Sequence, residues 1–401
     1  MSTSWPRRQT RSAKTPANTL PQPTVLPHRG RPIPRAALKP ELRAVRFFLA
    51  ADDIVRIAPF GDGNVNDTYC VTLASGEQRI LQRINPAVFP DPMAVIGNML
   101  VVTEHLRRFP PRDPGRETPF RTPLLYPGRS GYAFRDRDGS AWRMMELITG
   151  ARTCRTITSP GQARETGRML GLFHSQLRTL DPQSLVDTLP GFHDTNSYLH
   201  RYDRVRSEPR RHIPEPDRFC DLAVEKGRDR VNLLTERRDR LSHGIIHGDP
   251  KMDNFLFDQS CETIVSLIDL DTVRPGLLLH DLGDALRSCC NRAGEAPDKP
   301  GDAGFDPGLY AAWLEGYLST AGGLLTDEDK KSVVDGAMLI TFELGLRFYT
   351  DYLAGNRYFK VSYPEQNLRR ARTQFHLAES IDRQRDRLAA VFTDLTAAGK
   401  K

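Results

Sequence analysis

The chain has 401 residues, of which 39% are hydrophobic and 27% charged, a balance that argues against a wholly disordered, collagen-like or integral-membrane protein. The formal net charge is +7, but residues 1–40 hold eight Lys/Arg, eight Pro and no Asp or Glu. The other 361 residues carry a net charge of −1. We therefore predict a disordered basic tail over 1–40 and a near-neutral folded body, whose charge gives no reason to expect nucleic acid as a partner.

The cysteine pattern and the hydropathy profile favour a cytoplasmic protein with no membrane partner. No two cysteines form a CxxC pair, which argues against a zinc ribbon, and six in this length are sparse for a disulfide scaffold, so we expect buried, reduced thiols. The first 30 residues contain no apolar signal-peptide core, and no uncharged apolar run reaches the length of a membrane span. The cysteines are Cys70, Cys154, Cys220, Cys261, Cys289 and Cys290.

The first half of the chain alternates short apolar runs with turns. After a short helix at 43–50, runs rich in Ile, Val, Tyr and Phe predict strands, and helical spacing predicts one helix over 93–109. The sequence DRDGS is a hairpin signal between the last two runs. We therefore predict a small antiparallel sheet with one helix. The predicted strands are 53–60, 65–74, 79–85, 124–128, 130–136 and 141–148.

Helical spacing dominates from about residue 160, interrupted by two strand-like segments at 244–258 and 263–273. We predict that the chain divides near 147–151. The predicted helices are 160–180, 214–241, 281–290, 307–320, 327–353 and 369–392.

The most informative stretch runs from His247 to Asn254, HGDPKMDN, between two short apolar runs. A third apolar run ends at Asp269, fifteen residues after Asn254, and Asp271 follows. Phosphoryl transfer requires such a set, because one carboxylate aligns the acceptor hydroxyl and takes its proton, while an amide oxygen and a second carboxylate hold Mg²⁺ at the nucleotide phosphates. Plain surface turns are the alternative for any single residue of the set.

HGDxxxxN, followed by an apolar residue, Ile and Asp, resembles the catalytic and metal-binding loops of the aminoglycoside phosphotransferase and choline kinase superfamily. The resemblance implies ATP and Mg²⁺ as cofactors and Asp249 as the catalytic base. It further implies that His247 orients the loop, that Asn254 and Asp269 are Mg²⁺ ligands, and that Asp271 is a candidate for a second metal contact.

The same resemblance implies an α+β, bilobal, protein-kinase-like fold. Residues 41–148 would form a nucleotide-binding N-lobe, a small antiparallel sheet plus a helix. Residues 149–401 would form a larger, mostly helical C-lobe that carries the catalytic and acceptor residues.

Four further segments are similar to the N-acetylhexosamine kinase branch, whose members phosphorylate the anomeric hydroxyl of N-acetylglucosamine or N-acetylgalactosamine. This similarity implies an amino sugar as the small-molecule acceptor. Kinases of aminoglycosides, choline or homoserine remain alternatives, and the sequence does not indicate the oligomeric state. The segments are ILQRINPAVFPDP (80–92), LPGFHDT (189–195), IDLDTVRPGLLLHDLGDALRS (268–288) and LRFYTDYLAGNRYFKV (346–361).

The nucleotide should meet the first half of the chain. Gly61 and Gly63 lie in a turn between the first two strands, where glycines let backbone N–H groups approach phosphates. The third strand carries no Lys, so Arg83 is the candidate phosphate-binding cation. Gln82, on the opposite face of the strand, is the alternative. We expect Glu104, on the following helix, to pair with Arg83.

Adenine should contact the connection between the lobes around Glu146. Two other segments are candidates for binding the acceptor. His193 and Asp194 follow Pro-Gly in a turn, and Arg347, Asp351 and Tyr352 lie on a late helix. Carboxylates and arginines bind sugar hydroxyls, and aromatic faces cover the ring. The alternative for the helix is a packing seam with a surface ion pair.

Two other functions and two structural roles stay open. A metal phosphohydrolase could use His247, Asp249, Asp269 and the dipeptide His280-Asp281, but transition metals favour more histidine than this set offers. The missing strand lysine leaves room for a non-catalytic, kinase-like nucleotide-binding protein. Asp281 and Asp284 are expected to brace the catalytic loop or cap their own helix.

Overall fold

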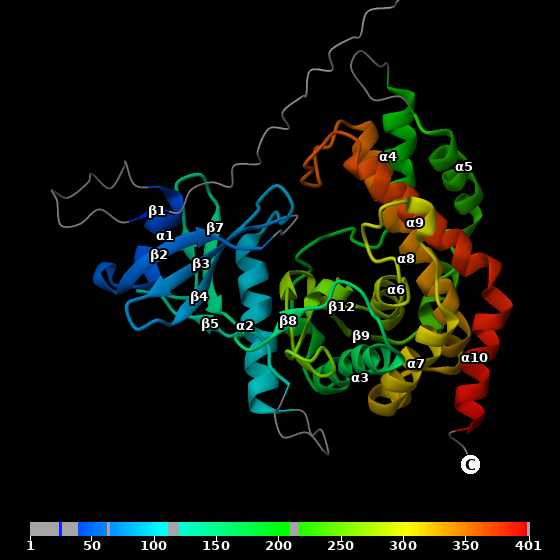
Figure 1. The fold of residues 1–401 in the computed structure, drawn as a ribbon, viewed down its shortest axis with the longest axis horizontal. Coiled ribbons are helices and arrows are strands. Elements are labelled where there is room, and N and C mark those ends of the chain that lie inside the picture. The colour runs from blue at the N-terminus through cyan, green and yellow to red at the C-terminus, as the bar shows by residue number, and fades with distance from the viewer. Residues whose placement is uncertain (1–23, 26–38, 62–64, 111–119, 209–215, 399–401) are drawn as a thin grey trace, which may run out of the picture.

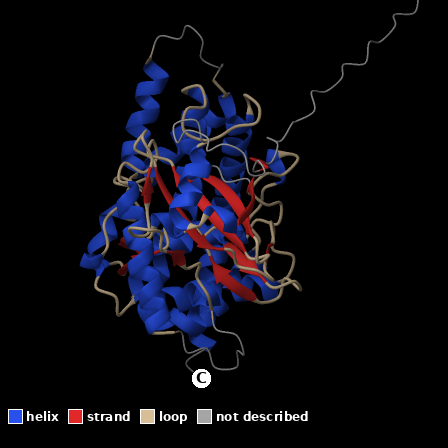
Figure 2. Ribbon diagram, turned by 90° about the vertical axis from the view of Figure 1, so that its left-hand side faces the viewer, coloured by secondary structure: helices blue, strands red, loops and turns tan. Residues whose placement is uncertain are grey.

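The computed structural model describes residues 24–25, 39–61, 65–110, 120–208 and 216–398. A twisted antiparallel sheet lies beside a larger, mostly helical part, and helix α2 (Pro92–Arg108) runs along the side of the sheet that faces the helices (Figure 1). Seen from the sheet side, the strands cross in front of the helices (Figure 2). The predicted α+β bilobal fold is confirmed.

The sheet contains seven strands in the order β1-β2-β3-β4-β7-β5, with β6 also paired to β7. All of these pairings are antiparallel, as predicted. The strands are β1 (Thr24–Val25), β2 (Ile54–Pro59), β3 (Asp67–Leu73), β4 (Gln78–Ile84), β5 (Leu125–Tyr126), β6 (Phe134–Arg135) and β7 (Ala141–Glu146).

The two faces of the sheet are covered by different helices. Leu81 and Trp142 pack on one face with residues of α1 (Pro40–Phe48). Ile84 and Ala141 pack on the other face with α2. Since side chains alternate along a strand, Gln82 shares the α2 face, which is the face turned toward the helical part.

Short strands carry the loops of the predicted site between the sheet and the large helices. β8 (Arg152–Thr153), β10 (Phe255–Phe257) and β11 (Ile264–Leu267) form one small sheet, and β9 (His243–Ile246) pairs with β12 (Arg274–Leu277). The turn η6 (Met252–Asn254) leads into β10, and η7 (Leu270–Thr272) follows β11.

The helices of the larger part pack closely. α3 (Pro160–Leu177) and α7 (Pro307–Ala321) touch through glycines: a Cβ on Gly316 would lie 1.9 Å from the Arg164 carbonyl oxygen, and one on Gly167 would lie 2.0 Å from that of Trp313. Such contacts tolerate no side chain. The other helices are α4 (Thr195–Ser207), α5 (Arg218–Gly227), α6 (Leu278–Cys289), α8 (Asp327–Leu353), α9 (Gln366–Arg383) and α10 (Arg385–Ala398).

Two sequence predictions differ from the structure. The single helix predicted over 214–241 is instead α5, followed by the 3₁₀ turns η4 (Arg228–Arg230) and η5 (Thr235–Arg240). Its apolar residues are too few after Val231 to sustain a buried helical face. Of the predicted disordered tail, only Thr24–Val25 and residues 39–40 are described, and the pair Thr24–Val25 extends the sheet as β1. The rest of the tail lies outside the described residues.

The expectation of six reduced thiols is wrong for one pair. Cys154 and Cys261 form a disulfide, whereas Cys70, Cys220, Cys289 and Cys290 are free. The pairing of β8 with β10 brings the two cysteines together, because one follows β8 and the other lies in the turn after β10. A disulfide between cysteines 107 residues apart in the chain has no local sequence signal. No helix in the described part of the chain is both long and apolar enough to cross a membrane.

Candidate active site

The loop after β9 is fixed by hydrogen bonds from its backbone. The Asp281 carboxylate, at the start of α6, accepts from the N–H of His247 at 2.6 Å and from that of Gly248 at 2.8 Å. Gly248 has a φ of +86°, and a Cβ there would lie 2.7 Å from the Thr272 carbonyl oxygen. The loop therefore requires glycine at this position, and Asp281 braces it, as the sequence suggested.

His247 is a buried positioning group. Its side chain is wholly buried, and burial lowers its pKa, so the imidazole is neutral. Nε2 lies 2.9 Å from the Ile268 carbonyl oxygen, and Nδ1 accepts from the Asp249 N–H at 3.3 Å. The ring therefore joins the loop that carries Asp249 to the strand end that carries Asp269.

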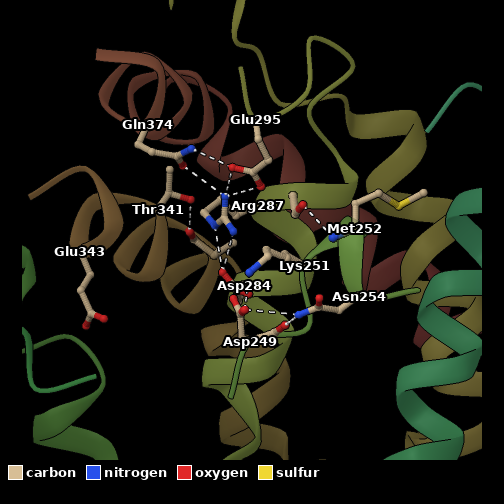
Figure 3. Close-up of polar contacts among 12 residues, drawn as sticks. Asp249, Lys251, Met252, Asn254, Asp284, Arg287, Glu295, Thr341, Glu343 and Gln374 are labelled. Carbon is tan, nitrogen blue, oxygen red and sulfur yellow. Dashed lines mark hydrogen bonds and ion pairs between the residues drawn. The ribbon is translucent and has the colours of Figure 1, made fainter. Parts of the chain in front are cut away.

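Asp249, Lys251 and Asn254 converge on one point of this loop (Figure 3). The Lys251 ammonium forms an ion pair with the Asp249 carboxylate. Asn254 Nδ2 donates to the backbone oxygen of Asp249 at 2.7 Å and to its Oδ2 at 3.3 Å. Burial alone would lower the pKa of Lys251, but Asp249 and Asp269 raise it above its ordinary value, so the ammonium stays charged.

Asp269 faces this group from the end of β11. Its backbone is left-handed, with a φ of +65°, and the residue is exposed to solvent. Surrounding protein atoms desolvate its carboxylate and the neighbouring Asp271 repels it, which together raise the pKa of Asp269 to about 7. A carboxylate held in this way favours a nearby cation.

The donor atoms fit a magnesium ion. Asn254 uses its amide nitrogen within the loop, which leaves its oxygen for another partner, and Asp269 accepts no hydrogen bond from the residues that the structure describes. Mg²⁺ prefers such oxygen ligands and takes few of them from protein. Within the described ranges, no three His, Cys, Asp or Glu side chains are grouped as metal ligands.

The carboxylate of Asp271 is bound to other residues. One of its carboxylate oxygens pairs with Arg143 of β7, and the other accepts from Asn66 at 2.7 Å. Both oxygens are thus occupied by protein donors, and the side chain is almost wholly buried. The sequence-based suggestion that Asp271 contacts a second metal is not supported by this geometry.

A charged network backs the loop from the side of α6 and α9 (Figure 3). Arg287 donates to Asp284 at 2.8 Å and to Glu295 at 2.7 Å, and Gln374 donates to Glu295 at 3.3 Å. The Oδ2 atom of Asp284 is buried and has no partner among the described residues. Burial raises the pKa of Asp284 even though Arg287 opposes it. Asp284 thus pairs with Arg287 behind the loop, and among the described residues no hydrogen bond joins its carboxylate to the loop or to the first turn of α6, so neither role expected for it is shown.

Of the residues predicted to bind nucleotide, Arg83 and Glu104 do not pair. Arg83 lies on the α1 face of the sheet, where it donates to Asp138 at 2.5 Å and to Ser140 at 2.9 Å. Glu104 pairs with Arg107, one turn along α2, at 2.8 Å. The expected Arg83–Glu104 pair is therefore wrong, because strand alternation turns Arg83 away from α2.

The other nucleotide candidates lie at or just beyond the ends of sheet strands. Gly61 has a φ of +73° in the turn after β2, while Gly63 lies outside the described residues. Glu146 ends β7, just before the connection to the helical part, and pairs with Arg121. Its N–H donates to the Leu124 carbonyl oxygen at 2.8 Å.

The acceptor candidates divide into two groups. Asp194 caps α4 by accepting from the Ser197 N–H at 3.1 Å, and Asp351 accepts from the N–H groups of residues 357–359 at 2.8–3.0 Å. Tyr352 is buried in the cluster that packs α8 on α5 and α9. These three side chains have structural partners, and the structure does not bring them to the Asp249 loop.

His193 and Arg347 form the second group of acceptor candidates, and both lie beside the Phe192 ring. His193 Nδ1 lies 3.0 Å from Glu343, which also accepts from the Thr195 hydroxyl at 2.7 Å. The Arg347 guanidinium forms no ion pair with any residue in the described ranges. Its central carbon lies 5.0–5.8 Å from the ring centroids of Phe192, Tyr198, Tyr358 and Phe359.

The pKa of Arg347 is raised by nearby groups, among them Asp249 of the catalytic loop. Burial would lower its pKa, but Tyr198, Tyr358, Glu343 and Asp249 raise it. Asp249 is therefore close enough to interact with this guanidinium. The four rings contact the Arg347 guanidinium through cation–π interactions, which do not use its N–H groups. Those N–H groups are therefore available to donate to a ligand.

Lys251 and Arg143 were missed at the sequence level. A lysine two residues after Asp249 could have been noticed from spacing alone. Arg143 had no such signal, because its partner Asp271 is 128 residues away.

A sequence model described as the phosphotransferase enzyme family (APH) matches residues 56–321. Solved structures share the fold at low identity. The choline kinase of Cryptosporidium parvum Iowa II has a TM-score of 0.57 at 14% identity, over 86% of this chain and 94% of that one. An aminoglycoside phosphotransferase of Alicyclobacillus acidocaldarius has 0.55 at 18%, over 92% and 98%. An amicoumacin kinase, solved with AMP-PNP, Ca²⁺ and its ligand, has 0.52 at 17%, over 82% and 89%.

Proposed function

Since the chain belongs to the APH phosphotransferase enzyme family and is thus a phosphotransferase acting on a hydroxyl acceptor, we propose that it is an ATP- and Mg²⁺-dependent kinase of N-acetylhexosamines. The acceptor atom would be the anomeric hydroxyl of N-acetylglucosamine or N-acetylgalactosamine. The residues around 41–148 would bind the nucleotide, and those around 149–401 would supply the catalytic and acceptor groups.

In this proposal Asp249 is the base. Its carboxylate aligns the acceptor hydroxyl for in-line attack on the γ-phosphate and accepts the hydroxyl proton as the new O–P bond forms. Lys251, already at this carboxylate, supplies a positive charge beside the transferring group. Asn254 and Asp269 would hold Mg²⁺, which neutralises charge on the nucleotide phosphates when bound.

The observation that carries the choice of acceptor is Arg347. Its guanidinium lies among four aromatic rings, interacts with Asp249 and has no ion-pair partner in the described part of the chain. The carboxylate of Glu343, which also raises the pKa of Arg347, already accepts from His193 and Thr195. An acceptor there meets hydrogen-bond donors and apolar faces, which suits the carbonyl and hydroxyl oxygens of a neutral sugar.

The same observation disfavours cationic acceptors. Aminoglycosides and choline carry positive charge and require free carboxylates or aromatic cages without a resident cation. Here the aromatic cage already holds Arg347, so an ammonium group would be repelled. Kinases of such amines are among the structural neighbours, but at 13–18% identity the likeness concerns the fold.

An ADP-release assay with ATP and Mg²⁺ tests the proposal. The acceptor panel contains N-acetylglucosamine, N-acetylgalactosamine, glucose, galactose, choline, homoserine and kanamycin. We expect release above background with an N-acetylhexosamine, and phosphate at the anomeric carbon by NMR. Stimulation by choline or kanamycin alone would overturn the sugar assignment. Nucleotide binding without turnover on any acceptor would favour the non-catalytic alternative.

A further inference from the structure

A buried ion pair joins the sheet to the loop that carries Asp269. Arg143, in the middle of β7, pairs with Asp271 of η7, and the two side chains are only 2% and 3% exposed. The residues are 128 positions apart in the chain. The pair therefore connects the two parts of the molecule at the point where the predicted metal site begins.

Each member of the pair is also held by a second residue from the sheet part of the molecule. Gln82 Oε1, on the neighbouring strand, accepts from Arg143 Nε at 3.1 Å and from Nη2 at 2.5 Å. Asn66, just before β3, donates to the second oxygen of Asp271 and accepts from the Asn85 N–H at 3.0 Å. The guanidinium and the carboxylate thus have one well-defined geometry.

Asp271 is two residues after Asp269, and the turn η7 links them. Fixing the Asp271 side chain against the sheet therefore restricts where the Asp269 carboxylate can lie. A buried charge whose partner is removed is strongly destabilised, so Asp271 and Arg143 must stay together. The Arg143–Asp271 pair therefore fixes the position of Asp269 relative to the sheet that would hold the nucleotide.

We propose that Arg143, rather than Arg83, is the cation of the sheet that serves phosphoryl transfer, as a positioning residue that acts through Asp271 on Asp269. This inference rests on the proposed nucleotide and Mg²⁺ site. Arg143 itself does not reach phosphate, because its donors are taken by Gln82, Asp271 and the Met99 sulfur. Arg83 lies on the α1 face and is bound to Asp138.

The test is equilibrium binding of a fluorescent, non-hydrolysable ATP analogue, with Mg²⁺ titrated or replaced by EDTA. Arg143→Lys keeps the charge but loses the planar fork that contacts Gln82 and Asp271 together. We expect about a tenfold weaker Mg²⁺-dependent affinity and unchanged affinity in EDTA. Arg79→Lys, on β4 in a surface pair with Glu77, is the matched control and should match wild type.

A double-mutant cycle tests whether Arg143 acts through Asp271. Asp271→Asn preserves shape and should weaken Mg²⁺-dependent binding as much as Arg143→Lys does. The double variant should bind the analogue no more weakly than either single variant, since each substitution removes the same Arg143–Asp271 interaction. Additive losses would contradict the proposed route. If Arg143→Lys fails to fold by circular dichroism, Asp271→Asn alone carries the test, and wild-type-like binding by it would overturn the inference.

The outcomes separate this inference from the proposed function. No Mg²⁺-dependent nucleotide binding by wild type would overturn both. Binding by wild type and equally by Arg143→Lys would overturn only the role of Arg143. If Arg83→Lys lowers the Mg²⁺-dependent affinity for the ATP analogue and Arg143→Lys does not, Arg83 regains the phosphate-binding role that the sequence suggested.

Discussion

Lys251 and Asp249, two residues apart on the loop after β9, form an ion pair at the centre of the proposed site. Their side chains are 28% and 30% exposed, and the neighbouring carboxylates keep the pKa of Lys251 above its ordinary value despite burial. The ammonium neutralises the carboxylate while the site is empty. In the proposed mechanism the same two groups would lie beside the reacting atoms, Lys251 as a cation and Asp249 as the base.

The first prediction concerns the base. Asp249→Asn keeps the size of the side chain but cannot accept the hydroxyl proton, so kcat should fall by about 10³-fold or more while nucleotide affinity changes little. The measurement is ADP release under saturating substrates. Asp253→Asn, at an exposed carboxylate on the same loop, is the control and should retain most activity. Near-normal turnover by Asp249→Asn would remove Asp249 from the chemistry.

Lys251 gives a second prediction. Lys251→Met removes the charge beside Asp249 and should lower kcat by about 10²-fold, because the cation stabilises charge that develops during transfer. Lys251→Arg, which keeps the charge with a different geometry, should recover part of the loss. Pre-steady-state phosphate transfer measures the chemical step directly. A change confined to the KM of ATP would show that Lys251 binds ground-state nucleotide only.

Arg347 should control acceptor affinity. Arg347→Met retains packing against the four rings but loses the hydrogen-bond donors, so the KM of the acceptor should rise by about 10- to 100-fold with a smaller effect on kcat. Arg357→Met, at an exposed arginine on the following loop, is the matched control. If Arg347→Met improves the use of choline or kanamycin, charge repulsion at this position is the reason that cationic acceptors are disfavoured. Equal acceptor KM values for Arg347→Met and wild type would contradict the proposed contact.

The sequence predicted well what depends on local pattern. The strand runs of the first half, the helix α2 and the late helices follow from period-2 and period-3.6 spacing, which burial on one face enforces. The convergence of Asp249, Asn254 and Asp269 was also predicted, because all three lie at strand ends within one short segment. The site roles of these residues stay predictions.

Long-range choices were less predictable. Whether Arg83 or a residue of another strand would face the helical part depended on the register of β4 against β7. A shift of one residue along a strand turns each side chain to the other face of the sheet. Asp351 was a candidate acceptor contact because carboxylates bind sugar hydroxyls, yet its carboxylate accepts hydrogen bonds from the backbone of 357–359. The Cys154–Cys261 disulfide likewise depends on the pairing of strands distant in the chain.

The final prediction follows from the raised pKa of Asp269. In the unfolded chain this carboxyl ionises near its ordinary value, about 3.9, whereas in the folded, metal-free protein it ionises at about 7. The unfolded state therefore releases its proton first, and folding loses stability as pH rises from about 4 to about 7, after which the loss is constant. Asp269→Asn has no such proton to lose.

Metal-free Asp269→Asn should consequently melt at a higher temperature than wild type at pH 8, by about 2 °C or more, with a smaller difference at pH 5. Adding Mg²⁺ should raise the Tm of wild type and not that of Asp269→Asn, because the variant lacks the anionic ligand. Thermal melts in EDTA and in Mg²⁺ from pH 5 to pH 9 measure both effects. Asp298→Asn, at an exposed carboxylate, should follow the wild-type profile. A lower Tm for Asp269→Asn at every pH would instead mean that the Asp269 carboxylate stabilises the metal-free fold. That result would contradict the prediction.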